Sequence, residues 1–230
     1  MNDTAIVFKN VSKEYYLEKP RTLTRWFNTL FSSFNKFTVI KDMSLVINKG
    51  NFILVTGSNG SGKTTFLKLI AGITLPNKGS IKTYGKIVPL IELGAGFNYE
   101  LTGRENIIIN ATILGIGKKK IKRITPQIIE FSGLKNFIDI PLKRFSLGMI
   151  SRLAFSIVSY SDPDILLLDE VFAMGDEEFR RKIISKLNQL RLDKITVIIV
   201  SHYPERLREI IEIDKEISLK NNNLQKKLDL

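Results

Sequence analysis

Cysteine is absent from the 230 residues, and its absence excludes several kinds of chemistry. The sequence offers no disulfide, no thiolate metal site and no cysteine nucleophile, which is typical of a reducing, cytosolic address. Long apolar runs are also missing, because stretches such as residues 107–117 are too short and too interrupted to span a bilayer. The first residues lack a basic segment followed by an apolar one, so we expect no signal peptide.

Acidic residues are scarce relative to basic ones: 23 stand against 35, for a net charge of +12. This balance favours an anionic partner such as nucleic acid, an anionic membrane face or a nucleotide. No acidic residue lies between Glu105 and Glu130, yet KKKIKR occupies positions 118–123. That basic run is either a solvated loop or helix end, or a contact with a membrane or a partner.

The most informative motif is GSNGSGKT, which follows the apolar run 51–56 and precedes a helical pattern. It matches the phosphate-binding P-loop in the strand, loop and helix context that this loop requires. Backbone N–H groups would face phosphate oxygens, Lys63 would reach the terminal phosphates, and Thr64 would offer its hydroxyl to Mg²⁺. The predicted nucleotide-binding residues here are Gly57, Ser58, Asn59, Gly60, Ser61, Gly62, Lys63, Thr64 and Thr65.

The arrangement of the elements predicts an α/β fold. Apolar runs at 51–56, 165–169 and 196–200 alternate with helical patterns, which indicates a mainly parallel sheet covered by helices. The region from about 98 to 159 carries helical patterns without a strong strand. We therefore expect one domain over 1–230, with a core of about 1–97 and 160–230 and an inserted helical subdomain of about 98–159.

Three further features point to hydrolysis. The run ILLLDE ends a predicted strand in two carboxylates, so Asp169 is placed to hold Mg²⁺, partly through water, and Glu170 to orient or deprotonate an attacking water. His202, the only histidine, ends another strand at the same sheet edge and could hydrogen-bond a γ-phosphate, although a lone histidine is more often structural. A third feature is FSLGM, where Ser146 is a plausible helix N-cap and a second anion site. Two phosphate-binding devices in one chain suggest that the second serves a neighbouring copy.

Together these motifs resemble the ATP-binding subunits of ABC transporters, over nearly the whole chain. The resemblance identifies GSNGSGKT as Walker A, ILLLDE as Walker B with catalytic Glu170, and Ser201-His202 as the switch histidine. It further implies nucleotide contacts from the signature residues Ser146, Leu147, Gly148 and Met149 and from Asp176 of the D-loop. Tyr15 would stack on adenine, with Tyr16 as a substitute. Asn98 would stand in place of the Q-loop glutamine. The expected cofactors are ATP and Mg²⁺, and Lys63 and His202 complete the catalytic set.

The run LGAGFNYELTGREN, with FSLGM and DEVFAMGD, resembles the branch that exports cell-surface polysaccharides such as O-antigen, capsule or teichoic acid. That resemblance implies an ATP-sandwich homodimer bound to a polytopic membrane permease, peripheral on the cytoplasmic face of the bacterial inner membrane. An insertion of about 20–37 supports it, because four aromatics and two leucines fall on one helical face flanked by basic residues. The same helix could instead pack on its own sheet.

Two other function classes compete with transport. An ABC-type ATPase that acts on nucleic acid would suit the charge, but repair and chromosome ATPases of this type separate the two motif sets by long coiled-coil arms, whereas residues 65–145 have ordinary domain length. Translation-associated relatives carry two ATPase halves in one chain, and this sequence has one. A small-molecule P-loop kinase or GTPase would explain neither FSLGM nor the strand before His202, and no guanine-reading motif is present. The motifs therefore favour a transport ATPase with no nucleic-acid partner.

Overall fold

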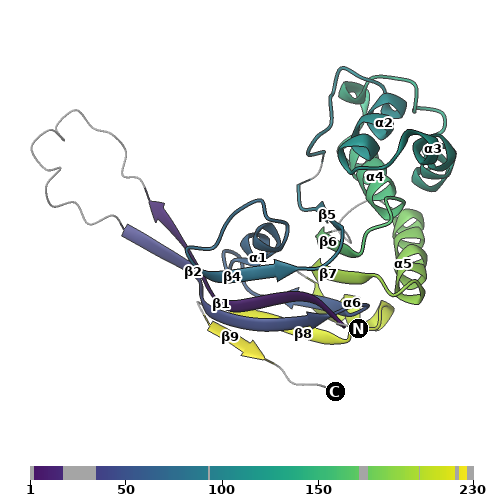
Figure 1. The fold of residues 1–230 in the computed structure, drawn as a ribbon. Helices are drawn as coiled ribbons and strands as arrows, with labels where there is room; N and C mark the ends of the chain where they lie inside the picture. The colour runs from purple at the N-terminus through teal and green to yellow at the C-terminus, as the bar shows by residue number, and fades with distance from the viewer. Residues whose placement is uncertain are drawn as a thin grey trace, which may run out of the picture.

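A computed structural model describes residues 3–17, 35–92, 94–170, 176–201, 203–220 and 223–226. The described strands form two sheets (Figure 1), a three-stranded antiparallel sheet in the order β2-β1-β4 and a six-stranded sheet in the order β5-β6-β7-β3-β8-β9. The strands are β1 (Thr4–Leu17), β2 (Asn35–Asn48), β3 (Phe52–Thr56), β4 (Lys78–Thr83), β5 (Ile87–Leu90), β6 (Ile165–Asp169), β7 (Thr196–Val200), β8 (Lys215–Lys220) and β9 (Asn223–Lys226). The helices are α1 (Lys63–Ile70), α2 (Gly103–Ile113), α3 (Lys118–Ser132), α4 (Leu147–Ser159), α5 (Glu177–Leu192) and α6 (Pro204–Ile210).

The larger sheet is parallel except at one edge. Strands β5, β6, β7, β3 and β8 run parallel, and only β9 pairs antiparallel, with β8. Every residue of β3 and β7 is buried, which explains their continuous apolar sequences, since a parallel sheet is covered on both faces. The predicted α/β architecture with a mainly parallel core is confirmed.

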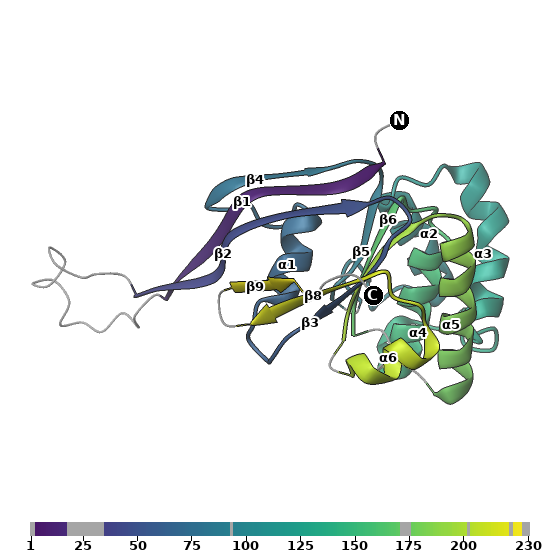
Figure 2. The same ribbon diagram turned by 90° about the horizontal axis from the view of Figure 1, so that it is seen from below.

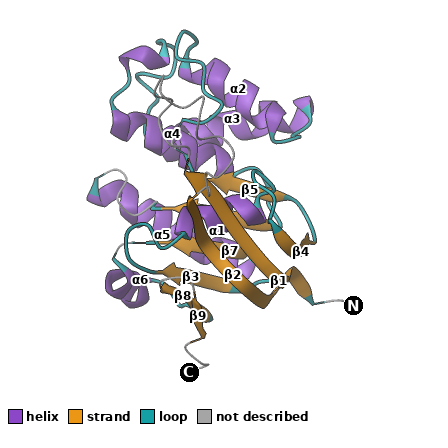
Figure 3. Ribbon diagram, turned by 90° about the vertical axis from the view of Figure 1, so that its left-hand side faces the viewer, coloured by secondary structure: helices purple, strands orange, loops and turns teal. Residues whose placement is uncertain are grey.

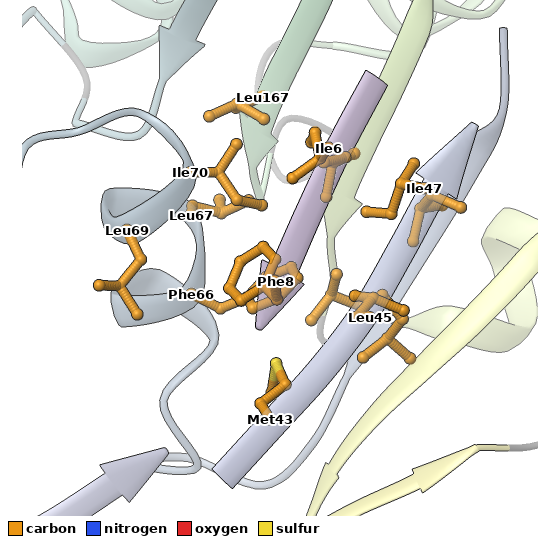
Figure 4. Close-up of a cluster of buried hydrophobic side chains, with 14 of the residues drawn as sticks. Ile6, Phe8, Met43, Leu45, Ile47, Phe66, Leu67, Leu69, Ile70 and Leu167 are labelled. Carbon is orange, nitrogen blue, oxygen red and sulfur yellow. The ribbon is translucent and has the colours of Figure 1, made fainter. Parts of the chain in front are cut away.

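Helix α1 lies between the two sheets. The rings of Phe8 on β1 and Phe66 on α1 stack with their centroids 5.3 Å apart. Figure 4 shows Met43, Leu45 and Ile47 of β2 in the same cluster as the α1 side chains. The antiparallel sheet thereby covers the helix that follows the P-loop and holds it against the parallel sheet. The run PNKGS at residues 76–80 predicts a turn, and this prediction is wrong, because strand β4 already begins at Lys78.

Helices α2, α3 and α4 form a separate layer at the β5 side of the parallel sheet (Figures 2 and 3). Helix α2 begins with a capping box, in which Thr102 accepts from the Glu105 N–H and the Glu105 carboxylate accepts in return. Helix α4 belongs to two cores, because Leu153 and Ile157 pack among α2 and α3 while Phe155 packs against the sheet. The expected helical subdomain is therefore present, and α4 joins it to the sheet.

The expected amphipathic insertion lies mostly outside the described residues, at 18–34. Within the described part of the chain, no helix is long and apolar enough to cross a bilayer.

Candidate functional site

The P-loop leaves the end of β3, in the middle of the larger sheet, and turns into α1. Gly57 has φ +154°, and a Cβ there would lie 2.4 Å from Ser61 Oγ. Gly62, the N-cap residue of α1, has φ +96°, and a Cβ there would lie 2.4 Å from Val39 Cγ1. Only glycine fits both positions, because a side chain would disfavour the backbone conformation and overlap its neighbours. Strand β2 thus closes over the loop at Gly62.

A buried cation lies in the curve of this loop. Lys63 is 6% exposed, and its Nζ donates to the carbonyl oxygens of Gly57 at 2.9 Å and Ser58 at 3.0 Å. The hydroxyl of Ser61 is buried, and no described atom accepts or donates a hydrogen bond to it. Among the described residues, Lys63 has no carboxylate partner and the Ser61 hydroxyl has no partner at all. Burying such groups costs free energy, and a bound anion would offset that cost. These groups fit the phosphates of a nucleotide.

The two predicted Mg²⁺ ligands lie side by side. Thr64 is in the first turn of α1 and Asp169 ends β6, and the Thr64 hydroxyl donates to Asp169 Oδ2 at 2.9 Å. A hydroxyl and a carboxylate beside a phosphate site are ligands that Mg²⁺ accepts. Glu170 follows with φ +53°, an unusual value for a residue with a side chain, and its N–H donates to Val200 O at 3.0 Å. Such backbone strain is concentrated at functional positions.

Glu92 is a site residue that the sequence reasoning missed. It follows β5 just as Asp169 ends β6, and it accepts a hydrogen bond from Lys68 Nζ at 2.8 Å. Lys68 is one helical turn beyond Thr64 on α1. The pKa of Lys68 is raised, chiefly by this bond to Glu92 and to a smaller extent by Tyr15 and Asp169, which places all of them in one electrostatic neighbourhood. The signal in the sequence is that Glu92 is the first charged residue after the apolar run 87–91.

Of the two candidate tyrosines, Tyr15 is the one beside α1. Tyr15 is close enough to Lys68 of α1 to be among the smaller causes of the raised pKa of that lysine, and the Lys13 ammonium lies 5.1 Å from the Tyr15 ring centroid. Tyr16 is the next residue of strand β1 and so points to the opposite face, where Lys36 lies 5.6 Å from its ring. Tyr15 is 39% exposed, which leaves ring surface for a base to stack on.

The signature segment opens α4. Ser146 is the N-cap and its hydroxyl accepts from the Met149 N–H at 3.2 Å, as predicted. Leu147 is 69% exposed, and a Cβ at Gly148 would meet only the Ser146 hydroxyl, at 3.8 Å. This helix end is therefore accessible to a second molecule.

Asp176 has two contacts within its own chain. It is the N-cap of α5, where it accepts from the Phe179 N–H at 2.9 Å, and it also accepts from Arg152 of α4 at 3.2 Å. The pKa of Asp176 is lowered, first by the Phe179 N–H and also by Arg152. Its carboxylate thus ties the helix that carries the signature to the segment after Walker B, and its contact with nucleotide stays a prediction.

Asn98 lies in the turn before α2. Its side chain accepts from the Glu100 N–H at 3.0 Å, and its backbone exchanges hydrogen bonds with Asn106. Glu92, rather than Asn98, is the side chain after β5 that reaches the P-loop helix, so a glutamine-like role for Asn98 stays a prediction. The catalytic expectation for His202 falls outside the described residues.

The P-loop follows β3 in the middle of the larger sheet, and its threonine, Thr64, donates a hydrogen bond to Asp169 at the end of β6. A helical layer is inserted beside this sheet. Together these features define a P-loop NTPase of the ATP-binding cassette type. The ABC transporter family model matches residues 40–173. The chain therefore belongs to the ABC transporter family, and the predicted ATPase class is confirmed.

Relatives and solved structures agree with this assignment. The chain is 42% identical over 190 residues, 83% of its length and 76% of the relative's, to the O-antigen export system ATP-binding protein RfbB of Klebsiella pneumoniae. It is 37% identical over 210 residues, 90% of its length and 78% of the relative's, to the teichoic acids export ATP-binding protein TagH of Staphylococcus saprophyticus. The fold matches the dimeric post-hydrolysis structure of the ATP-binding cassette MJ0796 bound to ADP and Pi, with a TM-score of 0.78, 20% identity and coverage of 98% of this chain and 100% of that one.

Proposed function

We propose that this chain is the ATP-hydrolysing subunit of an ABC transporter that exports a cell-surface polysaccharide of the O-antigen, capsule or teichoic acid type across the cytoplasmic membrane. The observation that carries this proposal is the 42% identity, over 83% of the chain, to an O-antigen export ATP-binding protein. The teichoic acid export relative supports the same class of cargo. In this role the chain works at the inner face of the membrane, as a peripheral subunit.

The proposed active unit is a homodimer with ATP between the P-loop of one copy and the signature of the other. The exposed N-terminus of α4, with Leu147 69% exposed, supports a contact across a dimer interface. Lys63 would hold the terminal phosphates, and Thr64 and Asp169 would hold Mg²⁺, whose charge lowers the barrier to phosphoryl transfer when bound. Glu170 would orient the attacking water and accept its proton.

A membrane subunit has a suitable docking place. A largely apolar groove of about 330 Å³ runs between the sheet edge and the helical layer. It is lined by Leu90, Phe97 and Leu114 among others, and Ile73 and Ile113, which also line it, are 59% and 69% exposed. The Lys68–Glu92 ion pair lies in its wall, one helical turn from Thr64. We propose that a helix of the membrane subunit occupies this groove and acts on the nucleotide site through α1.

The test is reconstitution with a polytopic membrane protein, to be sought among the genes that neighbour the one for this chain. We expect the pair to copurify in detergent and to show Mg²⁺-dependent ATPase activity. In proteoliposomes it should move a lipid-linked polysaccharide, and Glu170→Gln should retain ATP binding and abolish movement. ATPase activity that responds to DNA or RNA and not to the membrane protein would contradict the proposal.

A further inference from the structure

The helical layer carries a cluster of cations that the ATPase mechanism does not use. Four of them, Lys118, Lys119, Lys122 and Arg123, are exposed on the first turns of α3. Within the described part of the chain, none of the four forms an ion pair with a carboxylate. We name these four residues the basic face. The sequence contains no acidic residue between Glu105 and Glu130, so the first turns of α3 carry no carboxylate of their own to offset this charge.

The packing of α3 turns this face outward. Ile121, Ile124 and Ile128 are buried in the core of the helical layer, on the opposite side of the helix from the basic face. Lys120 lies between Lys119 and Lys122 in the sequence but does not belong to the basic face, because it is half-buried and forms an ion pair with Asp162. The charges also do not serve the helix itself, since the positive end of its dipole repels cations in the first turn.

A short segment of chain connects the proposed docking groove to the basic face. Helix α2 ends at Ile113, and Ile113 and Leu114 line the groove. Lys118 begins α3 four residues after Leu114, so the chain separates the first lysine from the groove lining by at most about 14 Å. A membrane protein seated in the groove would bring this part of α3 toward the lipid surface around it.

We propose that the basic face binds anionic phospholipid headgroups of the membrane that holds the transport partner, an inference that rests on the proposed function. Phosphate oxygens of lipids attract clustered lysines and arginines that come within about 8 Å, the screening length in physiological salt. Lipid is favoured over nucleic acid, because the groove that this short segment connects to the face exposes isoleucines, and because residues 118–123 include no aromatic side chain on which bases could stack.

The test compares two neutralised variants of the full chain in vesicle flotation without nucleotide. One is K118Q/K119Q/K122Q/R123Q, and the matched control removes four exposed lysines of the opposite, antiparallel-sheet part of the chain, K9Q/K41Q/K49Q/K78Q. At about fivefold per basic residue near the surface, we expect the first variant to bind vesicles of 70% phosphatidylcholine and 30% phosphatidylglycerol at least tenfold more weakly than wild type. The control should lose less than threefold, and phosphatidylcholine vesicles should show no difference among the three proteins.

Equal losses in both variants would overturn the proposal, because net charge alone would then explain binding. Unchanged vesicle binding by the first variant would also overturn the proposal. If that variant instead failed to bind the membrane subunit in detergent, the partner of the basic face would be an acidic protein segment. If it instead lost affinity for RNA, the partner would be nucleic acid. Both variants should keep wild-type ATPase activity and Tm. Failure of this experiment leaves the export proposal standing, since that one is tested by reconstituted transport.

Discussion

Substitution of Gly62 by alanine tests how closely the antiparallel sheet is fitted over the nucleotide site. The residue has φ +96°, so a side chain costs about 1 to 2 kcal/mol in backbone conformation. The new Cβ would also lie 2.4 Å from Val39 Cγ1, in a position where Val39 is only 8% exposed. Such overpacking adds about 1 to 3 kcal/mol. We therefore expect Gly62→Ala to lower the free energy of unfolding by about 2 to 5 kcal/mol.

The matched control is Gly60→Ala in the same loop. Gly60 has φ +77°, but a Cβ there meets nothing within 4 Å, so only the backbone cost of about 1 to 2 kcal/mol applies. For a chain of this length each kcal/mol corresponds to roughly 2 to 4 °C in Tm. Thermal unfolding without nucleotide should thus give a drop of roughly 4 to 20 °C for Gly62→Ala and roughly 2 to 8 °C for Gly60→Ala.

Val39→Ala provides the decisive combination, since it removes the atom that the new methyl group meets. The drop in Tm for V39A/G62A should be smaller than the sum of the two single drops, and binding of a fluorescent ATP analogue should recover in parallel. Equal drops for the two glycine variants, or additive drops for V39A and G62A, would refute the idea that β2 packs tightly on the loop.

Three further outcomes are expected. Glu170→Gln should bind ATP with unchanged Kd and lose nearly all turnover, and wild-type hydrolysis would show that another group activates the water. Charge reversal in K68E or E92K alone places like charges together and should lower Tm, whereas the double variant K68E/E92K should recover most of the lost Tm. A double variant with a Tm no higher than those of the single variants would show that the Lys68–Glu92 ion pair contributes nothing to stability. The pKa of Asp176 is lowered in the folded chain, so the stability it gives is present above its unfolded pKa and is lost as pH falls through its folded pKa. Arg152→Gln removes part of that shift, so the Tm difference from wild type should shrink in acid, and a pH-independent difference would contradict the linkage.

The sequence allowed the meeting of the P-loop with Asp169 to be predicted, because both follow strongly apolar strands and parallel strands end at one sheet edge. Glu92 was missed for a physical reason. Strand β5 is only four residues long and contains Pro89, so its apolar run gives a weak strand signal. Its partner, Lys68, depends on how α1 packs against the sheet, which no local pattern encodes.

Strand β4 shows the same limit. Residues 76–80 contain proline, asparagine and glycine and have the composition of a turn. Antiparallel pairing with β1, in the register Lys9 to Ser80 and Phe8 to Ile81, extends the strand back into this segment. Long-range pairing here overrides local preference, as it does more often in strands than in helices.

Helix α4 determines how far the signature can move independently of the P-loop. Its N-terminal turn carries Ser146, while Phe155 packs against Phe179 with ring centroids 6.2 Å apart. Arg152, between them, reaches Asp176. We therefore expect a shift of the helical layer to carry the signature with it and to act on the start of α5 through Arg152 and Asp176. Glu92, which follows β5 on the chain toward the same layer, accepts a hydrogen bond from Lys68 of α1, one helical turn beyond Thr64, so this second contact also lies close to the groups expected to hold ATP and Mg²⁺.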